Sequence, residues 1–171
     1  MNFKQTFEAF LEHERDLKTL HFATASKDGK PNSAPKLLVN IQAPNKVYLL
    51  DYKFTQTFEH LQENPRASLS FMDDASFTGY RLSGSVEILE SGEEFEKAKK
   101  SWEKRLIGYE ADRIIRRIRG NYSTKESENS LPPGYVIFKL TASEASMVKP
   151  GRILRAVHFE KPAEGGQGEE S

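Results

Sequence analysis

The sequence predicts a mainly β fold, a closed barrel or sandwich of antiparallel strands with a few flanking helices. Short apolar runs recur along the chain, which is the pattern of strands rather than of long helices. Turn residues such as Asp28-Gly29 separate neighbouring runs by only a few positions. Turns this short join only antiparallel neighbours. Six or seven such strands favour a closed barrel or a sandwich over a parallel sheet.

The composition indicates one globular domain and argues against several function classes. The chain has 171 residues, 25 lysines and arginines, 25 aspartates and glutamates, and no cysteine. This length is typical of a single domain, which we place at residues 1–159, followed by a disordered Gly- and Glu-rich tail at 160–171. Balanced charge argues against nucleic-acid binding. Without cysteine there are no disulfides, thiol nucleophiles or cysteine metal sites.

The sequence shows no feature of a secreted or membrane-bound protein. Its first residues contain no hydrophobic signal core, and no apolar run approaches the length that spans a bilayer. The four histidines show no spacing typical of metal ligands. We therefore expect a cytoplasmic protein with no membrane partner and no metal site.

The first part of the chain predicts a helix followed by three hairpin-linked strands. Phe3, Phe7 and Phe10 fall on one face of a helix at 2–14. The period of the apolar residues then changes to that of strands. The three strands are expected at 21–26, 32–42 and 46–52.

A short helix is predicted at about 55–63. Three apolar residues recur at helical spacing: Phe54, Phe58 and Leu61. Thr55 and Thr57 stand where the helix begins, and Asn64-Pro65 ends it, because proline disfavours the helical conformation of the residue before it. A helix that opens on hydroxyl residues after a strand is a candidate anion site, because its first N–H groups lack partners. The alternative is a plain capped helix.

The second part of the chain predicts four more strands and two helices. The strands are expected at 66–72, at 78–90, at 135–140 with an extension at 144–148, and at 152–159. Ser91 and Glu94 form a capping box, in which the serine caps the helix and the glutamate reaches back. This helix is expected to end near Leu106, and a second helix at about 109–119 ends at Gly120.

In this order of elements the chain resembles the pyridoxamine-phosphate-oxidase-like, FMN-binding split-barrel superfamily. The resemblance covers about residues 17–105 and rests on the order and spacing of several short segments. These segments are Ala-Thr-Ala-Ser-Lys-Asp-Gly-Lys-Pro at 23–31, Ala-Pro-Lys-Leu-Leu-Val at 34–39, Phe-Thr-Gln-Thr-Phe-Glu-His-Leu-Gln-Glu-Asn-Pro-Arg-Ala-Ser-Leu at 54–69 and Gly-Tyr-Arg-Leu-Ser-Gly-Ser-Val-Glu-Ile-Leu at 79–89. The resemblance implies a six-stranded antiparallel split barrel that forms a homodimer, with FMN at the subunit interface.

The resemblance also implies which residues contact the cofactor. They are Lys36, Leu37, Leu50, Asp51, Lys53, Thr55, Gln56, Thr57 and Gly79. Lys36 and the helix start at 55–57 would hold the FMN phosphate. Backbone near Leu37 and Leu50 would meet the isoalloxazine edge, and Gly79 would complete the pocket.

Two departures from the family pattern bear on function. The oxidases carry two basic residues after the helix-start hydroxyl, whereas this chain has Gln56 and Thr57. Lys53 and the partial charge of the helix N-terminus are expected to substitute for them. The C-terminal substrate-binding block of the oxidases is also not recognisable. Pyridoxamine-phosphate oxidation itself is therefore not expected.

With this resemblance, the sequence predicts an FMN-dependent oxidoreductase that acts on a small molecule by hydride transfer through the flavin. Such transfer needs no side-chain acid or base, which agrees with the lack of a catalytic motif, and no catalytic residue is assigned. A small-molecule substrate or a nicotinamide reductant would occupy the open flavin face. The alternatives are a non-enzymatic flavin-binding or flavin-storage module, and a split barrel that binds deazaflavin or haem.

Several of these residues also have a purely structural interpretation. Lys36 within a strand can face solvent, and Asp51 can be a surface charge at a strand end. In the arginine-rich segment 113–119, isoleucines can dock the helix while the arginines stay in water. The alternative is that these arginines reach the cofactor groove, with the loop 121–133 as a lid.

Overall fold

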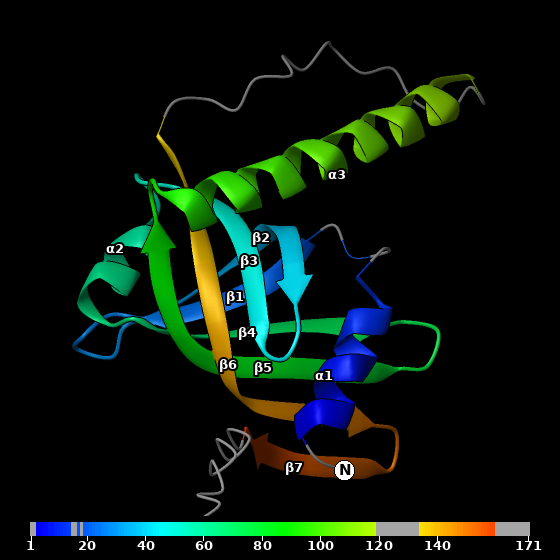
Figure 1. Ribbon diagram of the computed structural model, residues 1–171. Coiled ribbons are helices and arrows are strands. Elements are labelled where there is room, and N and C mark those ends of the chain that lie inside the picture. The colour runs from blue at the N-terminus through cyan, green and yellow to red at the C-terminus, as the bar shows by residue number, and fades with distance from the viewer. Residues whose placement is uncertain (1–2, 15–16, 18, 119–133, 160–171) are drawn as a thin grey trace, which may run out of the picture.

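The described part of the chain forms an antiparallel β-barrel flanked by three helices (Figure 1). The computed structural model describes residues 3–14, 17, 19–118 and 134–159, and the side chains of 110–118 and 153–158 lie outside this description. The strands are β1 (Thr19–Ala25), β2 (Pro31–Gln42), β3 (Lys46–Tyr52), β4 (Arg66–Asp73), β5 (Thr78–Leu89), β6 (Tyr135–Lys149) and β7 (Arg152–His158). The helices are α1 (Phe3–Glu12), α2 (Gln56–Glu63) and α3 (Glu93–Ile118).

Pairing of β3 with β6 closes the barrel. The strands are hydrogen-bonded in the order β3-β2-β1-β4-β5-β6-β7, and Val47 and Leu49 of β3 also pair with Leu140 and Phe138 of β6. All these pairings are antiparallel. Six strands therefore form the closed barrel, and β7 extends the sheet from the edge of β6. The predicted six-stranded barrel is confirmed, and the sandwich alternative is wrong.

The barrel interior is a single apolar core that α1 helps to fill. Phe22 of β1 and Phe138 of β6 are fully buried and stack at a centroid distance of 6.0 Å. Phe7 and Phe10 of α1 belong to the same buried cluster. The ring of Phe10 meets Phe71 of β4 edge-on at 5.0 Å. The predicted apolar face of the first helix therefore packs against the barrel.

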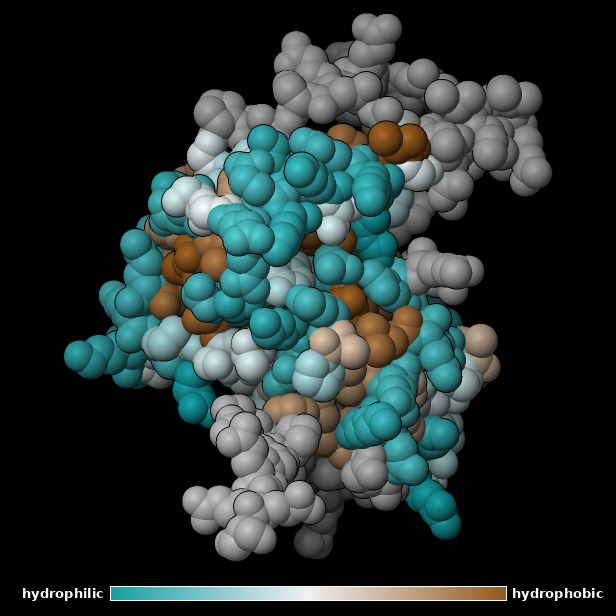
Figure 2. Space-filling model, in the orientation of Figure 1, coloured by the Kyte–Doolittle hydropathy of each residue, from teal (hydrophilic) through white to brown (hydrophobic). Residues whose placement is uncertain are grey.

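A second apolar cluster lies between α3 and the outer face of the barrel. Phe95, Ala98 and Trp102 of α3 pack against Val39 of β2 and Ile137 of β6, among other residues. The exposed surface over the described side chains of α3 is largely hydrophilic, apart from Ile107 (Figure 2). Because β3 lies between the interior core and α3, both of its faces are buried, which explains its continuous apolar run.

The prediction of two helices after β5 is wrong, because α3 is one helix from Glu93 to Ile118. Gly108 lies inside it, and its φ is not in the left-handed region that a helix stop requires. One interior glycine costs only about 1 kcal/mol relative to alanine, which a docked helix tolerates. The arginine side chains of 113–119, the loop 121–133 and the tail 160–171 lie outside the described residues.

The predicted capping box at Ser91 and Glu94 is also wrong. The N–H of Glu96 donates to the carbonyl of Gly92, so the helix starts one residue later than the box requires. The carboxylate of Glu94 instead contacts Tyr48 of β3 and Lys139 of β6. Tertiary partners therefore replace the expected local one. Within the part of the chain that the structure describes, no helix is long and apolar enough to cross a membrane.

Candidate functional site

The barrel brings together Lys36 of β2, Asp51 of β3 and Thr55, which we call the Lys36 cluster. The Nζ atom of Lys36 lies 2.8 Å from Oδ2 of Asp51. The Thr55 hydroxyl donates a hydrogen bond of 2.7 Å to the same Asp51 oxygen. The side chains of Lys36 and Asp51 are only 6% and 4% exposed. This is a buried ion pair with a hydroxyl as its third member.

Strand register explains why these residues meet. Leu37 and Leu50 face each other in the β2–β3 ladder, so Lys36 and Asp51 lie opposite each other just beyond that pair. Side chains alternate between the two faces of a strand. Lys36 and Asp51 therefore point to the same side as Leu38 and Leu49, which belong to the interior core. The interpretations of Lys36 as solvent-facing and of Asp51 as a surface charge are both wrong.

Thr55 is the N-cap of α2. Its backbone is extended, and its Oγ1 accepts the N–H of Phe58 at 3.1 Å. The predicted cap is therefore confirmed. The same side chain links the cap to the buried ion pair, because its hydroxyl proton is directed to Asp51. The start of α2 is thus attached to the end of the β2–β3 ladder that carries Lys36 and Asp51.

The other two residues predicted at the helix start, Gln56 and Thr57, differ in their exposure to solvent. Gln56 is exposed. Thr57 is 1% exposed, and its hydroxyl accepts a 3.1 Å hydrogen bond from the amide of Asn32. Of these two side chains, only Gln56 is open to a ligand in this chain.

Lys53, the predicted substitute cation, forms an ion pair with Glu90 at the end of β5. Its backbone N–H donates to the carbonyl of Gly134, just before β6. Lys53 is therefore tied to the strands beside it rather than to the Lys36 cluster. Both lysines that the sequence assigns to the phosphate are paired with a carboxylate.

Three other predicted residues lie in the barrel wall. Leu37 and Leu50 are paired neighbours, and both side chains pack with the cluster under α3. Gly79 lies at the start of β5, between Met72 of β4 and Val148 of β6. The structure therefore groups Leu37 and Leu50 with the Lys36 cluster, but it places Gly79 beside other strands.

A buried polar group under α2 was not expected from the sequence. His60 is 5% exposed, and its Nδ1 lies 3.3 Å from Oγ1 of Thr24 on β1. Asn32 of β2 donates to both Thr24 and Thr57. These residues have no motif spacing, and the only sequence signal is that His60 lies on the apolar face of a short helix. The group fastens α2 to the barrel.

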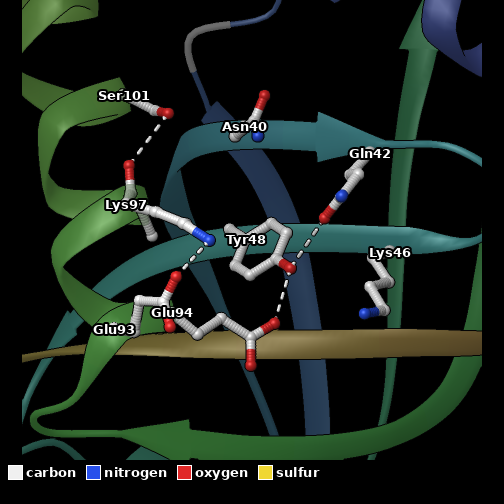
Figure 3. Close-up of a pocket in the computed structure, with 9 residues that line it drawn as sticks. Asn40, Gln42, Lys46, Tyr48, Glu93, Glu94, Lys97 and Ser101 are labelled. Atoms are coloured by element: carbon white, nitrogen blue, oxygen red, sulfur yellow. Dashed lines mark hydrogen bonds and ion pairs between the residues drawn. The ribbon is translucent and has the colours of Figure 1, made fainter.

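A separate cavity of about 600 Å³ lies between α3 and the outer face of β2 and β3 (Figure 3). Its lining residues are Asn40, Gln42, Lys46, Tyr48, Glu93, Glu94, Lys97, Ala98 and Ser101. Figure 3 shows the Tyr48 hydroxyl between the Gln42 amide and the Glu94 carboxylate, at 3.0 and 2.8 Å. Burial, and then the hydrogen bond to Glu94, raises the pKa of Tyr48. None of the predicted cofactor residues lines this cavity.

Glu94 is the centre of a polar network at that cavity. Its second oxygen lies 2.8 Å from Nζ of Lys139, which also pairs with Glu87. The hydrogen bond from Lys139 is the largest influence on the pKa of Glu94 and lowers it below 4.5, against the opposing effect of burial. Burial by itself lowers the pKa of Lys139, but its bonds to Glu87 and Glu94 raise it overall.

The lowered pKa of Glu94 predicts a loss of stability in acid. The ionised carboxylate stabilises the fold fully above its unfolded-state pKa, and this contribution is lost as the pH falls through the lower folded-state value. Wild-type protein should therefore lose more unfolding free energy between neutral and acidic pH than Glu94→Gln does. Urea titrations at both pH values measure this difference. Glu103→Gln, on an exposed position of α3, is the control. Equal losses in wild type and Glu94→Gln would contradict the prediction.

A protein-family model described as pyridoxamine 5'-phosphate oxidase matches residues 3–149. This range includes all six barrel strands, the Lys36 cluster and α2. The matched range is longer than the segment on which the sequence resemblance rests.

Solved structures with the same fold differ in what they are described as binding. A Clostridium acetobutylicum protein related to general stress protein 26 of B. subtilis, of the pyridoxinephosphate oxidase family, has a TM-score of 0.59, with 20% identity over 94% of this chain and 96% of that one. An FMN-binding, pyridoxamine 5'-phosphate oxidase-related protein from Nostoc punctiforme has a TM-score of 0.57, with 12% identity over 89% and 87%. A haem-binding protein from Mycobacterium smegmatis has a TM-score of 0.61, with 14% identity over 86% and 57%. At these identities the likeness shows the fold.

Proposed function

The chain belongs to the pyridoxamine 5'-phosphate oxidase family, and on this basis we propose that it is an FMN-binding flavoprotein, an oxidoreductase for a small molecule. The observation that carries the proposal is the position of Lys36. Lys36 is a buried cation in the β2–β3 ladder. It forms an ion pair with Asp51, and Asp51 accepts a hydrogen bond from Thr55, the N-cap of α2. A helix N-terminus beside a buried cation is a favourable environment for an anion.

The donors at this position fit a flavin phosphate only in part. Lys36, the Thr55 hydroxyl and the start of α2 suit an anion. Asp51, however, already accepts from both Lys36 and Thr55. A phosphate placed beside this carboxylate would meet a like charge, which disfavours binding. The position and the hydrogen-bond donors of the Lys36 cluster therefore suit a phosphate, but the net charge of the cluster does not.

A bound flavin would supply the hydride-transfer chemistry. In this proposal the chain itself binds and orients the cofactor. Leu37 and Leu50 are register partners in the β2–β3 ladder, next to the Lys36 cluster. Their backbone would line one edge of the flavin site. We propose a cytoplasmic homodimer with the cofactor at the subunit interface and a nicotinamide or another small molecule as the redox partner. In this dimer Gly79, which lies between β4 and β6 rather than beside the Lys36 cluster, would contact the cofactor from the second copy.

A second candidate function is binding of another ligand or storage of flavin without turnover. The observation that favours it is the pairing of both predicted phosphate cations with carboxylates, Lys36 with Asp51 and Lys53 with Glu90. A split barrel with this charge pattern would suit a ligand that carries no phosphate at this position, such as haem, and deazaflavin is the other alternative. The visible spectrum of the purified protein distinguishes these ligands.

Flavin binding can be tested directly on the purified protein. We expect flavin absorbance in the visible spectrum, or saturable quenching of FMN fluorescence when FMN is added to protein purified without it. Protein that shows neither signal would contradict the proposal, and a haem spectrum would support the second candidate. Steady reduction of the bound flavin by a nicotinamide, with turnover to an acceptor, would separate an oxidoreductase from a storage protein.

A further inference from the structure

We propose that the Asp51 carboxylate occupies the anion position of the Lys36 cluster and repels the flavin phosphate. It would thereby reduce the preference of the protein for FMN over riboflavin. This inference rests on the proposed flavin-binding function and concerns the specificity of the same site. It follows from how the carboxylate is held and from the charges around it.

The Asp51 carboxylate already makes the contacts that the cluster offers to an anion. One oxygen, Oδ2, accepts both from Nζ of Lys36 at 2.8 Å and from the Thr55 hydroxyl at 2.7 Å. The carboxylate is 4% exposed, so water does little to weaken these contacts. Charge-assisted hydrogen bonds of this length are the strong ones in proteins. A phosphate oxygen that used the same donors would have to displace Asp51.

The surrounding charges do not compensate for Asp51. Lys36 and Asp51 together carry no net charge, and the nearby Lys53 is paired with Glu90. Glu59, in the first turn of α2, adds a further negative charge near the helix start. His60 faces Thr24 of β1, with Asn32 bonded to the same threonine. Neither of the two lysines assigned to the flavin phosphate, Lys36 and Lys53, is therefore without a carboxylate partner.

A flavin that carries a phosphate therefore gains little over one that does not. In wild-type protein we expect FMN and riboflavin to bind with affinities within about threefold of each other, because the like charge of Asp51 offsets the attraction of Lys36 and the helix start. Replacing the carboxylate by an amide of the same shape removes that offset and leaves Lys36 as an unpaired cation. Asp51→Asn should then bind FMN at least about tenfold more tightly, with riboflavin affinity unchanged.

The test compares wild type, Asp51→Asn and Lys36→Met/Asp51→Leu. Dissociation constants for FMN and riboflavin come from flavin fluorescence quenching. A second readout is the shift of the unfolding temperature in inorganic phosphate, which should be larger in Asp51→Asn than in wild type. The double variant lacks both charges and should show neither the gain in FMN affinity nor the phosphate shift.

The outcomes separate this inference from the proposed function. No binding of either flavin by wild type or by any variant would overturn the proposed function itself. Flavin binding in which wild type prefers FMN over riboflavin by about a hundredfold, or in which Asp51→Asn loses FMN affinity, would overturn the inference alone. If Asp51→Asn does not fold, the comparison of FMN with riboflavin in wild type still decides the question.

Discussion

Replacing Lys36 alone by methionine is expected to destabilise the protein by about 3–5 kcal/mol, because it leaves the buried carboxylate of Asp51 without its counter-ion. Methionine approximates the shape of the lysine stem, so little of this cost comes from lost packing. Thr55 would remain as a donor to Asp51, but a hydroxyl does not neutralise a charge. The free energy of unfolding from urea titration measures the effect.

The matched control for this prediction removes both charges. Lys36→Met/Asp51→Leu should recover most of the lost stability, since a well-packed apolar pair often replaces a buried ion pair at little or no cost. In the double variant the Thr55 hydroxyl still reaches the carbonyl of Tyr52, and its oxygen still caps Phe58. A single variant within about 1 kcal/mol of wild type would contradict the burial of the pair.

Replacing Gly84 by alanine is expected to destabilise the barrel by about 3 kcal/mol or more. Gly84 lies where β5 and β6 shift register, and an added Cβ would lie 2.0 Å from the carbonyl oxygen of Thr141. Its next contacts are also backbone atoms, the carbonyl carbon of Thr141 at 2.8 Å and Cα of Ala142 at 2.9 Å. Because backbone cannot rotate away as a side chain can, the two strands would have to separate. Urea titration or loss of the folded circular dichroism signal measures the effect.

Gly79 on the same strand is the matched control for Gly84. A Cβ at Gly79 would approach the Met72 side chain no closer than 3.7 Å, which is an ordinary contact with a flexible group. Gly79→Ala should therefore change the unfolding free energy by less than about 1 kcal/mol. Similar effects of the two substitutions would show that β5 and β6 are not held as closely at Gly84 as the structure indicates.

The Lys36 cluster links the stability of the fold to the proposed ligand site. Thr55 caps α2 and bonds to Asp51, which in turn neutralises Lys36 at the end of the β2–β3 ladder. A substitution at any of these positions is therefore expected to change the folding free energy, and one that changes the net charge of the cluster is expected to change FMN affinity as well. For this reason each binding experiment proposed here needs an unfolding measurement on the same variant.

Most of the fold could be predicted because its signals are local. The turn at Asp28-Gly29, the helix start at Thr55 and the stop at Asn64-Pro65 are each determined by neighbouring residues. The error after β5 has the same origin. The chain was expected to break between Leu106 and Tyr109, but both of these side chains pack against the cluster under α3, so one helix continues through Gly108.

The candidate site was predicted less well. The residues around Lys36 and the cap at Thr55 were identified correctly as neighbours of one another, through the family resemblance. Their partners were not identified, because a charge pairs with whatever the barrel places opposite it. Neither the pairing of Lys53 with Glu90 nor the burial of Thr57 against Asn32 has a signal in the spacing of the residues.

The sequence by itself determined the order and type of the strands, their antiparallel pairing and the cap of α2, because hydrophobic periodicity and turn residues act over a few positions. Its local signals left a closed barrel and a sandwich as alternatives, and the pairing of β3 with β6 decided between them. Only the tertiary structure decided that Lys36 faces Asp51 inside the barrel rather than solvent. That contact depends on the register of β2 against β3, which the closed barrel sets as a whole. The charge of the proposed flavin site is therefore a property of the fold and not of any segment.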